Sequence, residues 1–362
     1  MNELYSRVNK ALSDRKKDGN YRSLTDYSKY IDFMSNDYLG LSKTESVFSK
    51  VENAPGSSRL IAGSNSFNLE LEEKLADYFK SDTAILYNSG YTANIGLFSS
   101  ILKKGDVILY DEEAHASIKD GIRLSFAKAF KFKHNDLNDL KRKLEKYNSN
   151  TVFVVIEGLY SMSGDIPKIN EINQLCIRFK AHLIVDEAHS AGTFGKDGQG
   201  LCAFSKDKSA VLARIITFGK AFGAHGACIL TRKEIKQFLI NFSRPFIYTT
   251  ALPNEIVAKI KLNLDKSKIT PQQQKLQSNV AYFREKIKGL SVLSHPNSPI
   301  QSIIFEDIDT LKMKEKKLLE KEFGVKAIYS PTVKKGSERL RISIHAFNSF
   351  KDIDGLCKIL TS

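Results

Sequence analysis

Hydrophobic and polar positions follow a regular alternation through the middle of this chain. From Thr83 to Thr217, short apolar runs alternate with amphipathic stretches, which predicts strands that alternate with helices. The predicted strands are 84–87, 107–110, 152–156, 182–185 and 210–217, and the predicted helices end near 102 or span 117–125, 137–147 and 169–179. This order predicts a mostly parallel sheet with helices on both faces.

The flanking segments follow other patterns. Residues 2–18 predict an amphipathic helix, because Leu4, Val8 and Leu12 share one face. After Pro253, a lysine-rich helical stretch (254–288) precedes strands near 300–305, 325–328 and 339–344 and a helix that begins near 351. We therefore predict an N-terminal helix and arm (1–50), a large α/β domain (51–250) and a smaller α+β C-terminal domain (251–362).

The composition is that of a soluble globular protein. Of 362 residues, 42% are hydrophobic and 27% are charged, and no run of about 18 apolar residues predicts a membrane span. The first five residues lack an apolar signal region, so we expect a cytoplasmic protein. Four cysteines lie far apart in the sequence, which predicts neither a disulfide framework nor a metal site: Cys176, Cys202, Cys228 and Cys357.

The net charge of +14 invites a nucleic-acid interpretation. Much of the charge comes from dispersed lysines, as in 312–321, where glutamates are interleaved with them in a pattern typical of a solvated helix face. A basic surface also suits a polyanionic small substrate such as a coenzyme A thioester. The charge alone does not separate these interpretations.

One apolar stretch, 215–227, is centred on a lysine. No carboxylate lies within ten positions of Lys220, and the nearest are Asp207 and Glu234. Burial would lower the pKa of this lysine, so that a neutral amine could attack a carbonyl and form a Schiff base. The alternative is a lysine at the edge of a core segment, with its charge held in water.

Other polar residues follow the ends of the predicted strands, where the functional groups of parallel sheets collect: Gly90, His115, Glu157 and Asp186. A lysine Schiff base points to pyridoxal phosphate, which needs a carboxylate for its ring nitrogen, amides for its phosphate and a flat partner for its ring. These needs are met by Asp186 for the ring nitrogen, by the segment 89–91 for the phosphate and by His115 for the ring. Taken singly, the histidine could be structural and the aspartate a helix cap.

Eight segments in order along the chain resemble the α-oxoamine synthases, which are fold type I, class II aminotransferase-like pyridoxal-phosphate enzymes. The segments are SNDYLGL (35–41), NSGYTANIG (88–96), HAS (115–117), EGLYSMSGD (157–165), VDEAHSAGTFG (185–195), TFGKAFG (217–223), IYTTALP (247–253) and PTVKKGSERLRI (331–342). They span nearly the whole chain. The resemblance implies the fold type I architecture, with a mostly parallel central sheet and a smaller C-terminal domain.

The resemblance also implies a role for individual residues. Lys220 would form the Schiff base and later move protons at the substrate α-carbon, with Asp186 on the pyridinium nitrogen and His115 on the ring face. The other implied contacts are Ser161 and His189 near the phenolic oxygen, Gly90, Tyr91 and Thr217 at the phosphate, Thr249 or Thr250 from a second subunit, Asn36 and Arg341 at the amino-acid carboxylate, and Arg22 at the acyl chain.

The reaction implied is the decarboxylative condensation of an amino acid with an acyl-CoA in a homodimer with shared sites. The stretches TFGKAFGAHGA and IYTTALP favour the biotin-synthesis branch, which joins L-alanine to pimeloyl-CoA. Branches that use glycine or serine, such as 2-amino-3-ketobutyrate ligase and serine palmitoyltransferase, and the autoinducer synthases stay open. Residues 64–66 depart from the histidine-containing loop common in the family.

Two alternatives come from other classes of protein. Residues 185–189 read VDEAH, like the ATP-hydrolysis motif of a helicase family, but neither Gly-Lys pair (195–196 or 219–220) completes the phosphate loop that such a motor needs. We therefore expect neither a nucleic-acid nor a membrane partner. A purely structural or binding protein would leave Lys220 and Asp186 without a purpose.

Overall fold

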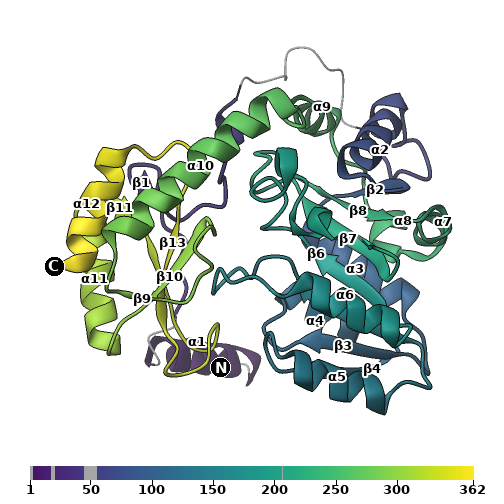
Figure 1. Ribbon diagram of the computed structural model, residues 1–362, viewed down its shortest axis with the longest axis horizontal. Coiled ribbons are helices and arrows are strands. Elements are labelled where there is room, and N and C mark those ends of the chain that lie inside the picture. The colour runs from purple at the N-terminus through teal and green to yellow at the C-terminus, as the bar shows by residue number, and fades with distance from the viewer. Residues whose placement is uncertain (1–2, 18–20, 45–54, 206) are drawn as a thin grey trace.

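The structure, a computed structural model, describes residues 3–17, 21–44, 55–205 and 207–362. Its centre is a seven-stranded sheet, here called the large sheet. The strands of the large sheet are β2 (Thr83–Tyr87), β3 (Val107–Asp111), β4 (Lys128–Phe132), β5 (Val152–Glu157), β6 (His182–Asp186), β7 (Val211–Thr217) and β8 (Ala227–Thr231). Their spatial order is β2-β8-β7-β6-β5-β3-β4 (Figure 1).

Most neighbouring strands of the large sheet are parallel, which confirms the predicted sheet type. Only β8 runs against its neighbours, because it pairs antiparallel with both β7 and β2. The sequence pattern predicts neither β4 nor β8. β4 is an edge strand with exposed lysines and lacks an apolar run, whereas β8 directly follows the glycine-rich stretch around Lys220, so its short apolar run merges with that stretch.

Helices cover both faces of the large sheet (Figure 1). One face carries α3 (Gly90–Ile101), α4 (Ala116–Arg123), α7 (Lys233–Phe242) and α8 (Arg244–Ile247), and the other carries α5 (Leu137–Lys146) and α6 (Ile169–Arg178). Along β5, Phe153 and Val155 pack on the first face, while Val154 and Ile156 pack on the second. A strand buried on both faces is apolar at every position, which is the pattern seen in the sequence.

The C-terminal part contains a four-stranded antiparallel sheet with the order β12-β13-β10-β9. These strands are β9 (Ser291–Val292), β10 (Ile300–Ile304), β12 (Lys326–Ile328) and β13 (Arg339–Ser343), and the helices are α9 (Asn254–Asn263), α10 (Lys266–Lys286), α11 (Ile308–Glu320) and α12 (Phe350–Thr361). The predicted helical stretch 254–288 is thus two helices. Asp265 separates them, because its side chain accepts the backbone N–H of Ser267 and caps α10.

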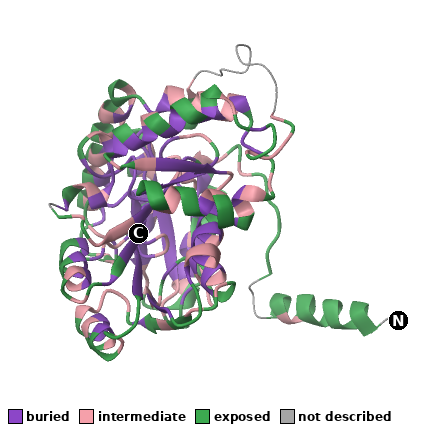
Figure 2. Ribbon diagram, turned by 90° about the vertical axis from the view of Figure 1, so that its right-hand side faces the viewer, coloured by how far each residue is buried: buried purple, intermediate pink, exposed green. Residues whose placement is uncertain are grey.

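The N-terminal part consists of α1 (Glu3–Lys17), β1 (Ile31–Asp32), the short 3-10 helix η1 (Leu41–Lys43) and α2 (Ser66–Phe79). Helix α1 has no buried residue and stands apart from the rest of the chain in Figure 2; residues 2 and 18 of the predicted helix lie outside the described residues. β1 pairs in parallel with β11 (Phe323–Gly324), so the N-terminal arm joins the C-terminal part. The predicted domain boundaries stay a prediction.

No helix in the described ranges is long and apolar enough to cross a membrane.

The carboxyl ends of β3, β5, β6 and β7 meet at one edge of the large sheet, because these strands are parallel. Glu157 and Asp186 are the last residues of β5 and β6, and the loops that follow β3 and β7 carry His115 and Lys220, as the strand pattern predicts. Two further 3-10 helices, η3 (Lys196–Gly198) and η4 (Leu201–Phe204), lie in the loop after β6.

Candidate active site

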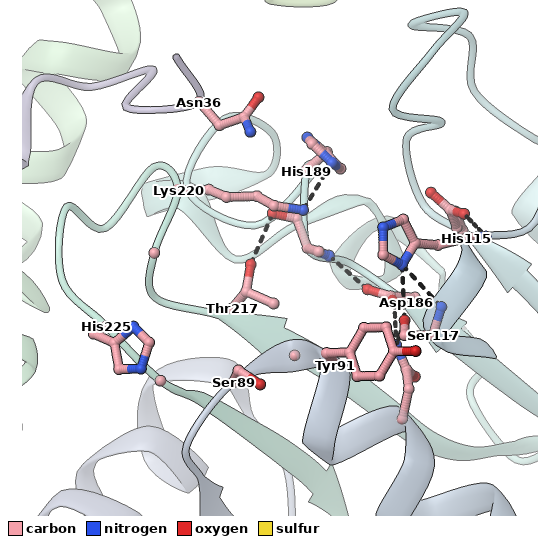
Figure 3. Close-up of a pocket in the computed structure, with 16 residues that line it drawn as sticks. Asn36, Ser89, Tyr91, His115, Ser117, Asp186, His189, Thr217, Lys220 and His225 are labelled. Carbon is pink, nitrogen blue, oxygen red and sulfur yellow. Dashed lines mark hydrogen bonds between the residues drawn. The ribbon is translucent and has the colours of Figure 1, made fainter. Parts of the chain in front are cut away.

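A cavity of about 260 Å³ lies at this edge of the large sheet (Figure 3). Its walls come from the N-terminus of α3, the ends of β5 and β6, the loops after β3, β6 and β7, and the N-terminal arm. The lining residues are Asn36, Ser89, Gly90, Tyr91, Asn94, His115, Ser117, Glu157, Asp186, Ala188, His189, Thr217, Gly219, Lys220, His225 and Gly226. We call it the cofactor cavity, after the cofactor that the sequence predicts.

Lys220 enters the cofactor cavity from the turn that follows β7. Its neighbours Phe218 and Phe222 are fully buried, and the lysine side chain is itself half-buried, as the apolar flanks predict. Burial lowers the pKa of Lys220 to about 8, against the opposing attraction of Asp186 and Glu157. A neutral amine is therefore accessible near neutral pH.

Lys220 is one end of a hydrogen-bonded chain that crosses the site. Its Nζ lies 2.7 Å from Nε2 of His189 (Figure 3). Nδ1 of His189 lies 2.7 Å from the hydroxyl of Tyr38, which donates to Oδ1 of Asn36 at 3.0 Å. Arg341 donates to the same Asn36 oxygen at 2.9 Å. The chain therefore connects the lysine to the arginine that the family resemblance assigns to the substrate carboxylate.

Asp186 ends β6 and is only 5% exposed. Its carboxylate accepts hydrogen bonds from the side-chain amide of Asn94 at 2.8 Å and from the backbone N–H of Ala188 at 3.0 Å. Asn94 also donates to Ser117 at 3.0 Å. A carboxylate held this way at the bottom of a cavity is arranged to face a cation.

Glu157 lies beside Asp186, because the two residues are register partners on β5 and β6. Burial, and then the charge of Asp186, raise the pKa of Glu157 to about 8. Its Oε1 accepts the backbone N–H of His115 at 2.6 Å. Glu157 thus fixes the loop that carries His115.

His115 caps the N-terminus of α4, and its Nδ1 lies 2.8 Å from the hydroxyl of Ser117. Burial lowers its pKa, and the nearby Lys220 lowers it further, while Asp186 acts against both. The imidazole faces the cofactor cavity, across from the Lys220 side (Figure 3). A neutral, flat ring with one fixed nitrogen can stack on an aromatic ligand.

The N-terminus of α3 forms another wall. Ser89 caps it in a capping box with Thr92, so the first two helical amides, of Gly90 and Tyr91, have no partner within the helix and are available to an anion. A side chain at Gly90 would collide with the methyl group of Thr217. The glycine therefore allows strand β7 to approach this helix end closely.

Several residues assigned by the resemblance lie outside the cofactor cavity. Ser161 and Arg22 line a second, neighbouring cavity. Arg341 lies behind Asn36, and its Nε donates to the backbone oxygen of Ser161 at 2.7 Å. Thr249 and Thr250 line a separate small pocket, where both accept hydrogen bonds from Asn88, Thr249 through its hydroxyl at 3.1 Å and Thr250 through its backbone oxygen at 2.9 Å.

Sequence reasoning missed four participants: Tyr38, Asn94, Ser117 and His225. Asn94 lies one helical turn after Gly90, so its direction toward the cavity follows from the predicted helix. Ser117 lies two residues after His115 and contacts its ring, and His225 lies five residues after Lys220, so both were close to residues already named. Tyr38 carries no such signal, because its partner His189 is 151 positions away.

The residues of this site fit pyridoxal phosphate. The cavity combines a lysine with a lowered pKa, a buried carboxylate, an imidazole and free helix amides, which together match the groups that this cofactor presents. Oδ1 of Asn94 is buried and has no hydrogen-bond partner within the described ranges. By contrast, the described part of the chain has no group of three or more His, Cys, Asp or Glu residues that could hold a metal ion.

Comparison with known proteins agrees with this geometry. Residues 28–360 match the family model for aminotransferase class I and II. The 8-amino-7-oxononanoate synthase of Lysinibacillus sphaericus is 36% identical over 336 residues, which cover 90% of this chain and 86% of that protein.

Solved structures extend the comparison to three dimensions. The 8-amino-7-oxononanoate synthase of Francisella tularensis is 32% identical with a TM-score of 0.79, covering 92% of this chain and 97% of that one. A serine palmitoyltransferase with pyridoxal phosphate is 26% identical with a TM-score of 0.89, covering 99% and 97%. The expected fold type I architecture is confirmed. By these matches the chain belongs to the class I and II aminotransferase family and, within it, to the α-oxoamine synthases, which are pyridoxal-phosphate-dependent acyltransferases.

Proposed function

We propose that this protein binds pyridoxal 5'-phosphate and condenses L-alanine with pimeloyl-CoA. The products are 8-amino-7-oxononanoate, free coenzyme A and carbon dioxide, as in biotin synthesis. The observation that carries the proposal is that Lys220 and Asp186 line one cavity at the carboxyl edge of the large sheet. The choice of substrates is supported by the names of the relatives at 34–36% identity.

The residues around the cofactor cavity have proposed roles in holding the cofactor. When bound, the cofactor supplies an electron sink for a carbanion at the amino-acid α-carbon. Asp186 would hold the positive ring nitrogen, and His115 would cover the ring face. Gly90, Tyr91 and Thr217 would hold the phosphate, and His189 would lie near the phenolic oxygen, with Ser161 as a further candidate.

Lys220 would move the protons. Its lowered pKa allows the amine both to accept a proton from the substrate α-carbon and to return one after carbon dioxide leaves. The hydrogen bonds that link His189, Tyr38 and Asn36 would hold the side chains of Lys220 and Arg341 at fixed positions relative to each other. Arg341 and Asn36 would bind the amino-acid carboxylate, since a guanidinium matches that geometry.

We also propose a homodimer in which Thr249 or Thr250 of one subunit serves the phosphate site of the other. Within one subunit both threonines accept hydrogen bonds from Asn88, one residue before the α3 cap, so the exchange between subunits rests on the family resemblance. Analytical ultracentrifugation tests it: a monomer at micromolar concentration would contradict it.

A visible absorption spectrum tests the proposed function directly. The purified protein supplied with pyridoxal phosphate should show a band that is absent in Lys220→Ala and that changes on addition of L-alanine. Adding pimeloyl-CoA should then release coenzyme A, and mass spectrometry should detect 8-amino-7-oxononanoate. No band, even with added cofactor, would contradict the proposal.

A second candidate shares the chemistry but not the substrates. The similarity to serine palmitoyltransferase, with a TM-score of 0.89 over nearly the whole chain, favours testing L-serine with a long-chain acyl-CoA. A spectral response to L-serine rather than L-alanine, together with product from palmitoyl-CoA, would support this candidate.

A further inference from the structure

A second cavity, of about 680 Å³, adjoins the cofactor cavity, and His115 lines both. We call it the acyl cavity. Its walls come from the loop after β3, the segment that begins at Ser161, and the segment 330–339 that leads into β13. Such a volume is typical of a small-molecule site.

Two arginines on β13 point to the same side of the small sheet. Arg339 and Arg341 are two residues apart on one strand, so their side chains lie on one face, about 7 Å apart along the strand. Leu340 and Ile342, between and after them, face the hydrophobic core instead. Arg341 faces the cofactor cavity through Asn36, whereas Arg339 lines the acyl cavity.

The two guanidinium groups differ in how they are used. Arg341 donates to Ser161, Ser343 and Asn36. Arg339 donates only through Nε, to the backbone oxygen of Ser337 at 2.9 Å, and within the described ranges neither of its terminal nitrogens has an acceptor. Yet Arg339 is only 5% exposed. The fork of this guanidinium is therefore open to the acyl cavity, where a carboxylate would match it in geometry and charge.

The charges around the acyl cavity leave Arg339 available. Glu112 and Glu113 both line the cavity: Glu112 is paired with Lys334 at 3.0 Å, and Glu113 lies 3.8 Å from Nε2 of His134. Asp165 is held by His134 at 2.8 Å. Burial lowers the pKa of Arg339, and the attraction of Glu113, Asp165 and Glu338 does not offset it.

We propose that Arg339 binds the free carboxylate at the far end of the acyl donor, and so makes the acyl cavity selective for thioesters of dicarboxylic acids. This inference rests on the proposed function. The strand spacing assigns one arginine to each carboxylate of the reaction: Arg341 to the amino acid and Arg339 to the acyl chain. A monocarboxylic acyl chain would leave the guanidinium of Arg339 buried and unpaired.

The test compares pimeloyl-CoA with heptanoyl-CoA, which has the same chain length but ends in a methyl group. Binding of each thioester to the cofactor-loaded protein is measured by calorimetry without amino acid, and coenzyme A release is measured with L-alanine. In Arg339→Gln, the dissociation constant for pimeloyl-CoA should rise about 100-fold, as expected for loss of one partner of a buried charge pair. The constant for heptanoyl-CoA should stay within about twofold.

Two further variants complete the design. Arg339→Lys keeps the charge and should recover part of the affinity, and Lys326→Gln removes one positive charge from the exposed end of the neighbouring strand and should change neither constant. Equal losses for both thioesters in Arg339→Gln would overturn the inference, and so would a loss of discrimination in Arg22→Gln instead. If the wild-type protein bound and turned over neither thioester, the proposed function itself would fail.

Discussion

The Nζ atom of Lys220 lies 2.7 Å from Nε2 of His189, in a site where burial holds the pKa of that histidine well below its usual range. His189 is therefore neutral at physiological pH and can accept a hydrogen bond from Lys220 at Nε2 while donating one from Nδ1 to Tyr38. Tyr38 in turn donates to Asn36. The hydrogen bonds therefore all run in one direction, from Lys220 through His189 and Tyr38 to Asn36.

The lowered pKa of Lys220 predicts a distinct reactivity. Below about pH 8 its amine is an ammonium ion, and above about pH 8 it is a neutral nucleophile. Pulse labelling of the cofactor-free protein with acetic anhydride, read by mass spectrometry, should therefore show half-maximal labelling of Lys220 near pH 8. Exposed lysines have a pKa of about 10.4 in general and should follow a later curve. If Lys220 and the exposed lysines were labelled with the same pH dependence, the lowered pKa of Lys220 would be contradicted.

Gly90 should not tolerate a side chain. Gly90→Ala places a methyl group against the Cγ2 methyl of Thr217 and should cost about 1–3 kcal/mol through overpacking. Thr217→Ser removes the opposing methyl and keeps the hydroxyl, so the double variant should regain most of the loss. Thermal unfolding and the dissociation constant of pyridoxal phosphate measure the effect, with Thr217→Ser alone as the control. If Gly90→Ala changed neither the unfolding temperature nor the dissociation constant, this result would argue against a close approach of β7 to the N-terminus of α3.

The loop that carries His189 depends on a buried ion pair. Arg214 donates to Glu187 at 2.5 Å, and both side chains are almost fully buried. Arg214→Met should lower the free energy of unfolding by about 3–5 kcal/mol, because Glu187 would be left as an unpaired charge. Glu187→Gln added to that variant should recover part of the loss. Urea unfolding measures both.

A matched control for this pair lies on the surface. Lys141 and Glu145 are 3.8 Å apart on an exposed helix face, so Lys141→Met should change the free energy of unfolding by less than about 0.5 kcal/mol. If the double variant at 187 and 214 were no more stable than Arg214→Met, the charge-based explanation would be wrong.

His134 should give stability that depends on pH. Burial would lower its pKa, but hydrogen bonds at 2.8 Å to Asp111 and to Asp165 raise it to about 10. Because the pKa in the folded protein is raised, the contribution is complete below about pH 6.5, the ordinary value for an unfolded chain, and is lost as the pH rises through about 10.

The test compares His134→Gln with the wild type in urea unfolding at pH 6 and at pH 10.5. The variant should be less stable by about 2 kcal/mol at pH 6, as expected for hydrogen bonds between charged groups, and the difference should shrink at pH 10.5. A difference that did not vary with pH would mean that His134 contributes through packing alone.

The local pattern of the sequence determined the large sheet and much of the site. Parallel strands with helices between them bring their carboxyl ends to one edge, so His115, Glu157, Asp186 and Lys220 converge whatever the details of packing. The apolar flanks of Lys220 likewise indicated its burial, because Phe218 and Phe222 belong to the core. Strands β4 and β8 were beyond this pattern, since one lies at an exposed edge and the other follows a glycine-rich turn.

Contacts between distant segments were decided only by the tertiary structure. Asn36 and Arg341 meet although 305 positions separate them, and Tyr38 reaches His189 across 151 positions. The same holds for Arg339, which lines a second cavity and whose two terminal nitrogens have no acceptor in the described part of the chain. Each depends on how the N-terminal arm and the C-terminal sheet pack against the large sheet. Local periodicity records which face of an element is buried, but not which distant side chain will lie opposite it.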